Sequence, residues 1–193
     1  MNTPVLLLIV LNFTLIGLLP RVFFRHDGRL NVRWWVTALP FGIVPGFLIA
    51  AAGAGLTPVA RGWLAGGGWL TAGAMISVVL SSASIGLICL TLGTHRIPIA
   101  LWHQDGDAPQ HIVTYGAYRW IRHPFYAAFL LAFGSAAVFR PHWVTLGALG
   151  YALVALNLTA RREEQRLAGS EFGAQYRQYL GRTGRFVPRA GTR

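Results

Sequence analysis

The chain has 193 residues, of which 54% are hydrophobic and only 12% are charged. An average soluble domain carries about a quarter charged residues, so this composition predicts a membrane protein. The formal net charge is +11, and every basic residue behind it is an arginine, because the chain contains no lysine. Such a charge can indicate nucleic-acid binding, but these arginines lie between apolar stretches. The positive-inside rule explains that distribution, and we expect no nucleic-acid partner.

Five apolar segments follow one another and are candidate membrane helices. They run from about Pro4 to Leu19, Trp34 to Ala54, Trp69 to Leu92, Phe125 to Phe139 and Trp143 to Ala160. A helix needs about 20 residues to cross the hydrocarbon core, which the second and third segments reach and the first and fifth approach. The fourth is shorter, and the tight turn at Pro141 predicts that it forms a helical hairpin with the fifth. We therefore expect an all-α polytopic membrane protein with about five transmembrane helices in one membrane domain, residues 1–193. Residues 1–92 hold three of the helices, and residues 93–193 hold the hairpin and a tail.

The distribution of arginine predicts the orientation in the membrane. Of the 17 basic residues, 15 fall in the first connection, the third connection and the C-terminal tail. The second connection has only Arg61 and the hairpin turn only Arg140. Because basic loops stay in the cytoplasm, the N-terminus should lie outside and the C-terminus inside, with the lipid bilayer as the permanent partner. We expect a bacterial inner-membrane protein.

Small residues at helical spacing predict where helices pack closely. Gly73, Ser77 and Ser81 recur every four residues in the third segment, and Gly42 and Gly46 do so in the second. Such spacing lets the backbones of neighbouring membrane helices approach each other.

Other polar and reactive residues predict little chemistry. The single cysteine, Cys89, lies inside an apolar segment, so we expect a buried, inert thiol. Asp105 and Asp107 lie in a polar, turn-like run without the spacing of a metal site, and we expect a solvated loop and no metal there.

A cationic, ring-rich stretch opens the fourth segment. Residues 118–126 read YRWIRHPFY. Pro124 can begin a helix because the first turn needs no amide donor from it. His123 and Tyr126 would then surround a helix start, where free amides and the positive end of the helix dipole attract carboxylate. Placing ionisable residues at the ends of membrane segments costs free energy, so by default they indicate a functional site. The residues here could hold a zwitterionic, adenine-bearing cofactor.

A carboxylate pair follows the fifth segment. Glu163 and Glu164 stand directly after Arg161 and Arg162. Arg161 and Glu164 are three residues apart and therefore share a helix face. The carboxylate can accept hydrogen bonds from ribose hydroxyls or an amino group, and the arginine can hold an anionic group of an acceptor. Alternatively, the four residues only form a solvated, mutually paired helix end, and the spacing alone leaves both readings open.

The tail contains an amphipathic stripe. Phe172, Tyr176 and Tyr179 recur at intervals of four and three residues, which predicts a helix. It would lie along the cytoplasmic membrane surface, where it could cover the site, act as an interfacial anchor, or do both.

Taken in order, these motifs resemble the signature of the isoprenylcysteine carboxyl methyltransferase and phospholipid methyltransferase superfamily. That pattern is roughly H-x-L-V-x-x-G-x-Y-R-x-x-R-H-P-x-Y, then a hydrophobic hairpin, E-E-x-x-L, F-G-x-x-Y-x-x-Y and R-F-x-P. The similarity covers about the last 85 residues, from QHIVTYGAYRWIRHPFY onward. Beyond that stretch the matching residues are Glu163, Glu164, Leu167, Phe172, Gly173, Tyr176, Tyr179, Arg185, Phe186 and Pro188. Gln110 departs from the pattern by standing at the family's histidine position, with His111 one place later.

The resemblance implies an integral-membrane methyltransferase that uses S-adenosylmethionine without a Rossmann domain. Carried over position by position, the implied cofactor contacts are Gln110, His111, Ile112, Val113, Tyr118, His123, Pro124, Tyr126 and Glu164. Arg161 would bind the methyl acceptor, with Arg162 in reserve, and Arg161 and Glu164 would be the catalytic residues. The acceptor would be a lipophilic or membrane-delivered carboxylate, thiol or amine. Nothing in the sequence specifies it or the oligomeric state.

Two other functions fit parts of the sequence. The C-terminal half also resembles membrane sterol reductases, which hold NADPH in an analogous pocket, although such chains are usually longer. A non-catalytic helical membrane protein that keeps the fold would bind neither cofactor.

Overall fold

The computed structural model describes residues 2–18, 29–30, 32–54, 67–94 and 112–189. The helices are α1 (Thr3–Leu18), α2 (Val32–Gly53), α3 (Gly67–Thr94), the short 3-10 helix η1 (Gly116–Arg119), α4 (Pro124–Phe139), α5 (Trp143–Ala168) and α6 (Gly173–Arg182). The structure has no described strand, and an isolated parallel β-bridge joins Ile121 and Gly184. The predicted all-α class is confirmed.

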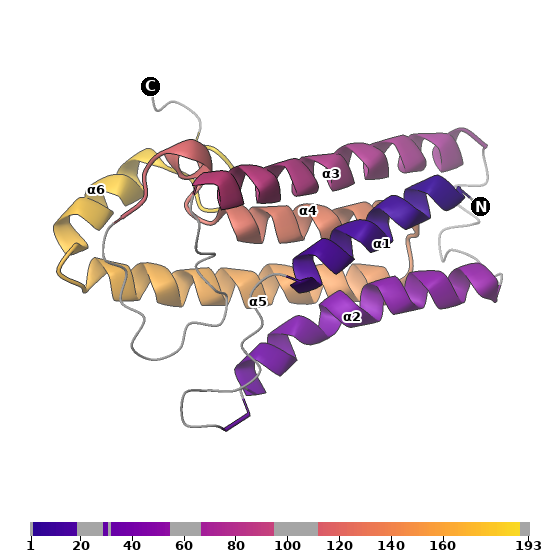
Figure 1. The fold of residues 1–193 in the computed structure, drawn as a ribbon, viewed down its shortest axis with the longest axis horizontal. Coiled ribbons are helices and arrows are strands. Elements are labelled where there is room, and N and C mark those ends of the chain that lie inside the picture. Colours follow the sequence, from indigo (N-terminus) through magenta and orange to yellow (C-terminus); the bar gives the residue numbers. More distant parts are fainter. Residues whose placement is uncertain (1, 19–28, 31, 55–66, 95–111, 190–193) are drawn as a thin grey trace.

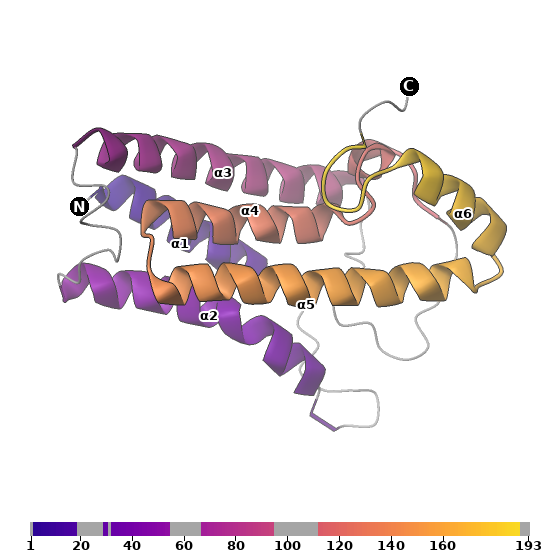
Figure 2. The same ribbon diagram turned by 180° about the vertical axis from the view of Figure 1, so that it is seen from behind.

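The long helices form an elongated bundle with two distinct ends. Figures 1 and 2 show α3, α4 and α5 running side by side, with η1 and α6 at one end, which we call the site end. At the opposite end lie the start of α1, the end of α2, the start of α3 and the turn between α4 and α5. We call this the hairpin end. Successive helices therefore alternate in direction along the bundle.

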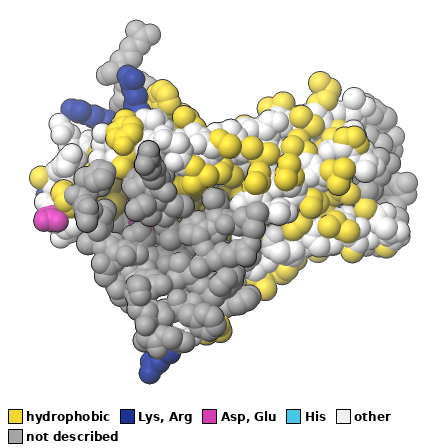
Figure 3. All heavy atoms as spheres, in the orientation of Figure 1, with side chains coloured by type: hydrophobic (Ala, Val, Ile, Leu, Met, Phe, Trp, Pro, Cys, Tyr) yellow, Lys and Arg dark blue, Asp and Glu magenta, His cyan; other side chains and the backbone are white. Residues whose placement is uncertain are grey.

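Helix length and surface character are those expected of an integral membrane protein. Among the described residues, two helical stretches are long and apolar enough to cross a membrane, Thr71–Thr94 and Trp143–Ala168. The helical stretches Thr3–Gly17, Leu39–Gly53 and Pro124–Phe139 are apolar but shorter. Large hydrophobic side chains are exposed along the flank of the bundle, as Figure 3 shows. On a protein surface that faces water, charged side chains would be interspersed among them. The count of five spans stays a prediction.

The fifth helix continues past its apolar segment. The apolar run ends near Ala160, and α5 extends through the charged run to Ala168, as the expected shared helix face of Arg161 and Glu164 requires. Arginine, glutamate and glutamine are good helix formers, so loss of hydrophobicity does not end the helix. The extra turns carry Glu163 and Glu164 beyond the apolar part of the bundle and toward η1 and α6.

Aromatic rings join three helices in the core. Phe133 of α4 meets Phe13 of α1 edge-to-face at a centroid distance of 5.1 Å and Phe41 of α2 at 4.9 Å. Phe41 also packs on Phe129 at 5.2 Å. Such edge-to-face pairs contribute about 0.5–1.5 kcal/mol beyond the burial of their area.

Hydroxyl groups line the contact between α3 and α4. Gly73, Ser77 and Ser81 are buried there, as their spacing predicted. The Ser77 hydroxyl donates to the Ser135 carbonyl and the Ser135 hydroxyl to the Ser77 carbonyl, both at 3.0 Å. The Ser81 and Ser135 hydroxyls lie 2.8 Å apart. These bonds satisfy polar groups where no water is available and fix the register of the two helices.

Two packing expectations were wrong. No described atom lies within 4 Å of a Cβ built at Gly42 or Gly46, so this pair does not mark a close helix contact. Cys89 is exposed, not buried. It follows the buried Ile88 by one position, about 100° around the helix, which points it away from α4.

The predicted hairpin is present and has a defined turn. The His142 ring caps α5 by accepting from the Val144 amide at 3.2 Å. Phe47 of α2 packs on that ring, with centroids 4.6 Å apart. Arg140 is buried beside the turn and donates to the Ala51 carbonyl at 3.4 Å. The turn is thereby attached to the end of α2.

Candidate functional site

The segment before α4 is positioned by a close approach to α3. Gly116 has φ +61°, and a Cβ at this position would lie 2.0 Å from the Thr94 hydroxyl oxygen. Only glycine fits both the backbone conformation and the space. As predicted, Pro124 occupies the first turn of α4 and His123 precedes it as N-cap. The tight packing of η1 on the end of α3 therefore fixes where the RHP stretch begins.

Helix α6 folds back over the site end. The turn after α5 brings Gly173 so near the Ala168 carbonyl that a Cβ would lie 2.4 Å from its oxygen. The aromatic stripe of α6 faces inward, with Tyr176 and Tyr179 buried. The Tyr179 hydroxyl donates to the Tyr118 carbonyl at 2.6 Å. Burial raises the pKa of Tyr179 to about 12, so this hydroxyl remains a donor at neutral pH.

Residues 183–188, which we call the strap, pair with the segment that enters α4. Three backbone hydrogen bonds join them: Gly184 N–H to Trp120 O (3.1 Å), Arg122 N–H to Gly184 O (2.8 Å) and His123 N–H to Arg185 O (3.1 Å). The strap bends sharply, because a Cβ at Gly184 would lie 1.7 Å from the Val187 carbonyl oxygen. This pairing aligns Arg122 and Arg185 on either side of the end of α5.

Glu164 is the centre of the resulting ion network. Its side chain is only 10% exposed. Arg122 donates from Nε to Oε1 at 3.0 Å, and Arg185 donates from Nε to Oε1 at 3.1 Å and from Nη2 to Oε2 at 2.5 Å. Arg122 also donates to the carbonyls of Leu180 and Thr183. The Glu164 carboxylate raises the pKa of Arg185. One buried carboxylate therefore links α5, the entry to α4, the end of α6 and the strap.

Glu163 lies against a pair of stacked rings. The Tyr126 hydroxyl donates to its Oε1 at 2.6 Å, and His123 Nδ1 lies 3.5 Å from its Oε2. The His123 and Tyr126 rings are stacked, with centroids 5.1 Å apart and planes 7° apart, and Phe186 of the strap lies edge-on at 6.2 Å. His123 Nε2 is 3.3 Å from Glu164 Oε1 but lacks the alignment of a hydrogen bond. It is a buried polar atom with no hydrogen-bond partner among the described residues.

These contacts exclude mutual pairing of the carboxylates with Arg161 and Arg162, while the ligand-binding reading stays a prediction. Glu163 and Glu164 do not form a mutually paired helix end with the arginines beside them, since their partners come from distant segments. Arg161 and Arg162 are exposed, and neither has a hydrogen bond or ion pair within the described part of the chain. Both are therefore accessible to a group that approaches from outside.

The structure brings some of the expected site residues together and leaves others apart. His123, Tyr126 and Glu164 converge, and Pro124 and Tyr118 are buried next to them in the chain. Val113 is buried and Ile112 is half-buried in the stretch before η1, whereas Gln110 and His111 lie outside the described residues. Arg122 and Arg185 were not anticipated as members of the cluster. The sequence did contain a signal for both, because Arg122 belongs to the R-H-P motif and Arg185 to the R-F-x-P motif of the family pattern.

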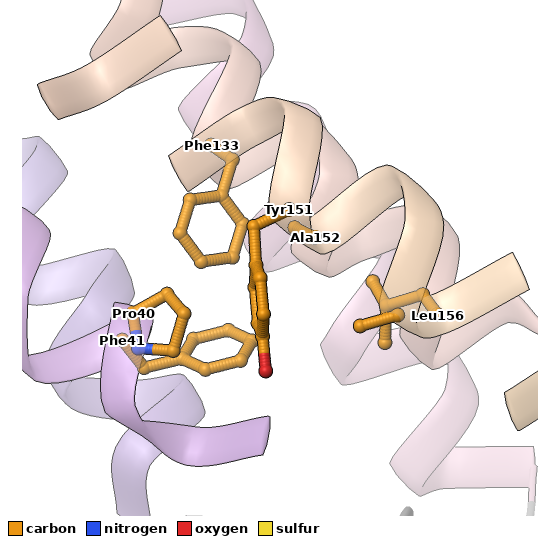
Figure 4. A pocket seen from close by; sticks show the side chains of 7 residues that line it. Pro40, Phe41, Phe133, Tyr151, Ala152 and Leu156 are labelled. Carbon is orange, nitrogen blue, oxygen red and sulfur yellow. The ribbon is translucent and has the colours of Figure 1, made fainter. Parts of the chain in front are cut away.

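A pocket elsewhere in the bundle is apolar. It lies between α2, α4 and α5, and Figure 4 shows the Phe133 and Phe41 rings on one side of the Tyr151 ring and Leu156 on the other. Its lining is completed by Pro40, Ala152, Ala155 and Leu156. None of these residues belongs to the charged cluster, so the pocket is separate from it.

The donors and acceptors of the cluster are of the kinds that bind polar, charged ligands. Carboxylates accept from hydroxyl and amino groups, guanidinium groups bind a carboxylate, and stacked rings pack on a flat base. The unpartnered His123 Nε2 adds a polar atom that such a ligand could engage. In the described residues no group of histidine, cysteine and carboxylate side chains has the arrangement of a metal site.

Comparison with known proteins gives one match. The model of the isoprenylcysteine carboxyl methyltransferase (ICMT) family matches residues 74–169. That range covers most of α3, all of α4 and α5, and the stretch that leads into α4, but not α6 or the strap. No curated protein and no solved structure matches the chain.

Proposed function

Because the chain belongs to the isoprenylcysteine carboxyl methyltransferase family and is a membrane methyltransferase, we propose that it moves a methyl group from S-adenosylmethionine to a lipophilic, membrane-delivered acceptor. The observation that supports this donor is the assembly of His123, Tyr126 and Glu164 at one end of an apolar bundle. Aromatic, cationic and anionic groups meet there, and in the proposed arrangement this end of the bundle is where a water-soluble donor and a lipid-borne acceptor come together.

The proposed donor site combines the stacked rings and the carboxylates. S-adenosylmethionine supplies a methyl group activated by its sulfonium. His123 and Tyr126 would pack against the donor, and Glu163 and Glu164 would accept from its hydroxyl or amino groups. The remaining proposed contacts are Gln110, His111, Ile112, Val113, Tyr118 and Pro124. Methyl transfer needs alignment and exclusion of water more than a strong acid or base, and a buried cluster provides both.

Arg161 is the proposed acceptor-side residue. It is exposed one turn before Glu164, and no described residue pairs with it. A carboxylate or thiolate acceptor held there needs no base, whereas an amine acceptor must lose a proton. Arg161→Ala should lower turnover while leaving donor affinity nearly unchanged, and Arg161→Lys should restore it only in part, because lysine lacks the bidentate fork. Arg166→Ala, at another exposed arginine of α5, is the control. Near wild-type turnover in Arg161→Ala would remove the assignment.

The proposed orientation places the site end in the cytoplasm and the N-terminus outside, in a bacterial inner membrane with five spans. The alternating helix directions support it, as do the described arginines that η1, the end of α5, α6 and the strap place at the site end. Reporter fusions at Arg193 and within residues 62–68 should report opposite sides of the membrane. The same side for both would contradict the five-span arrangement.

Donor binding tests the proposal directly. Purified protein should bind S-adenosylhomocysteine with a micromolar Kd, which corresponds to about 8 kcal/mol. Membranes that contain the protein should transfer labelled methyl from S-adenosylmethionine into a lipid-extractable product. Saturable binding of NADPH without S-adenosylhomocysteine binding would favour a reductase. Binding of neither would favour a non-catalytic membrane protein.

A further inference from the structure

The strap supplies contacts that complete the site from outside the region matched by the family. Arg185 lies beyond residue 169, where the match ends, yet it makes two of the three hydrogen bonds that Arg122 and Arg185 donate to Glu164. Its Nη1 donates to Asn157 on α5 at 2.6 Å, so its guanidinium group is held from two sides. Its backbone carbonyl accepts from the His123 amide. A single residue of the strap therefore contacts two residues of the proposed donor site, the Glu164 side chain and the His123 backbone.

The hydrogen bonds that Glu164 accepts from the two arginines leave part of its carboxylate able to accept a further hydrogen bond. An ionised carboxylate offers about four lone-pair positions. Arg122 and Arg185 take two of them at Oε1, and Arg185 takes one at Oε2. One position at Oε2 is left. With both guanidinium groups in place the carboxylate is fixed in orientation, and its remaining acceptor position has a fixed direction.

We infer that Arg122 and Arg185 are positioning residues, which hold Glu164 and His123 in the geometry that receives the methyl donor when the strap is docked. This inference rests on the proposed function. The inference means that two equilibria are coupled: docking of the strap on the entry to α4 strengthens donor binding, and donor binding stabilises the docked strap. Such coupling is reciprocal, so the factor by which strap docking raises donor affinity equals the factor by which donor stabilises the docked strap.

Two variants separate the backbone of the strap from the side chain of Arg185. Gly184→Ala places a Cβ 1.7 Å from the Val187 carbonyl oxygen and should undock the strap. Arg185→Gln keeps the backbone pairing with His123 and removes the guanidinium group. Gly181→Ala is the matched control, because Gly181 lies on α6 just before the strap and no atom lies within 4 Å of a Cβ there.

The experiment measures S-adenosylhomocysteine affinity and amide hydrogen exchange on the full-length chain. Exchange is read at the amides of Arg122, His123 and Gly184, which the strap pairing protects. Gly184→Ala should lose this protection and weaken affinity about tenfold or more, and Arg185→Gln should weaken affinity to a similar degree with the protection largely kept. Arg185→Lys should recover part of the affinity, since one ammonium can replace one of the bonds. Gly181→Ala should match wild type in both measurements.

Reciprocity adds a test on the wild-type chain. Saturating S-adenosylhomocysteine should slow exchange of the same three amides by about the factor that Gly184→Ala costs in affinity. Unchanged affinity in both Gly184→Ala and Arg185→Gln would overturn the inference while leaving the proposed function standing. A wild-type chain that binds no S-adenosylhomocysteine would overturn the proposed function, and the inference with it.

Discussion

Replacing Glu164 with glutamine should destabilise the folded chain more than any other charge-neutralising change at the site end. The side chains of Glu164, Arg122 and Arg185 are 10%, 12% and 30% exposed, so the network is mostly shielded from water. Glutamine has nearly the same shape, but it removes the negative charge and turns one oxygen into an amide donor that faces an arginine. With its oxygen at the Oε1 position, the amide can still accept from Arg122 and from Arg185 Nε, but both bonds lose the negative charge of the acceptor. Its NH2 group at the Oε2 position then faces Arg185 Nη2, donor against donor.

The loss can be estimated from the bonds. Hydrogen bonds to charged groups contribute about 1.5–3 kcal/mol each, and Glu164→Gln removes or weakens at least two. The share that involves Arg185 is reduced by solvent screening, because this side chain is almost one-third exposed. We expect a loss of about 2–4 kcal/mol in the free energy of unfolding, in line with the cost of breaking a buried ion pair.

The measurement is reversible unfolding in mixed micelles of detergent and denaturing surfactant, followed by tryptophan fluorescence. Glu171→Gln is the control, because Glu171 is exposed in the turn before α6. An exposed substitution of this kind should change stability by no more than about 0.5 kcal/mol. If Glu164→Gln were no more destabilising than Glu171→Gln, the two-arginine network would not be part of what holds the strap and α5 together.

Two further changes test smaller parts of the structure by the same unfolding measurement. Tyr126→Phe keeps the stacked ring but removes the hydroxyl that donates to Glu163 at 2.6 Å. It should lower the free energy of unfolding by about 1–3 kcal/mol. No loss would show that this hydrogen bond does not contribute to stability. Ser135→Ala removes the hydroxyl that bonds across to α3 and should cost about 1 kcal/mol, whereas Ser82→Ala, on the exposed side of α3, should cost nothing measurable.

Local sequence signals predicted much of this structure. The small residues of α3 and the hairpin turn at Pro141 follow from spacing and turn chemistry alone. The start of α4 at Pro124 follows from the missing amide of proline. The meeting of the RHP stretch with the carboxylate pair was also anticipated, because both stand at the same end of a two-helix hairpin.

The partners of the carboxylates were not predictable in the same way. Arg122 and Arg185 are 42 and 21 residues from Glu164 along the chain, whereas Arg161 and Arg162 are adjacent to the pair. The positive-inside rule treats all of these arginines alike, since it concerns charge on a side of the membrane and not contact. Choosing among them requires the path of the strap, which depends on the backbone pairing at Gly184. Exposure of Cys89 likewise depends on which helix packs on which face of α3.

The arginines at the site end fall into two physical classes with different responses to salt. The positive charges of Arg122 and Arg185 are balanced in number by the negative charges of Glu163 and Glu164, and the ion pairs of both arginines with Glu164 are largely shielded. Arg161, Arg162 and Arg166 of α5 are exposed and have no carboxylate partner in the part of the chain that the structure describes, so their field extends into solvent. Interactions of exposed charges fade beyond about 8 Å at physiological ionic strength, whereas buried pairs are screened much less.

Raising the salt concentration should therefore weaken capture of an anionic acceptor, which would be seen as a higher KM for that acceptor. Donor affinity and the free energy of unfolding should change little. A donor affinity that fell with salt as steeply as acceptor capture would mean that the cluster is open to solvent and that the strap does not shield it.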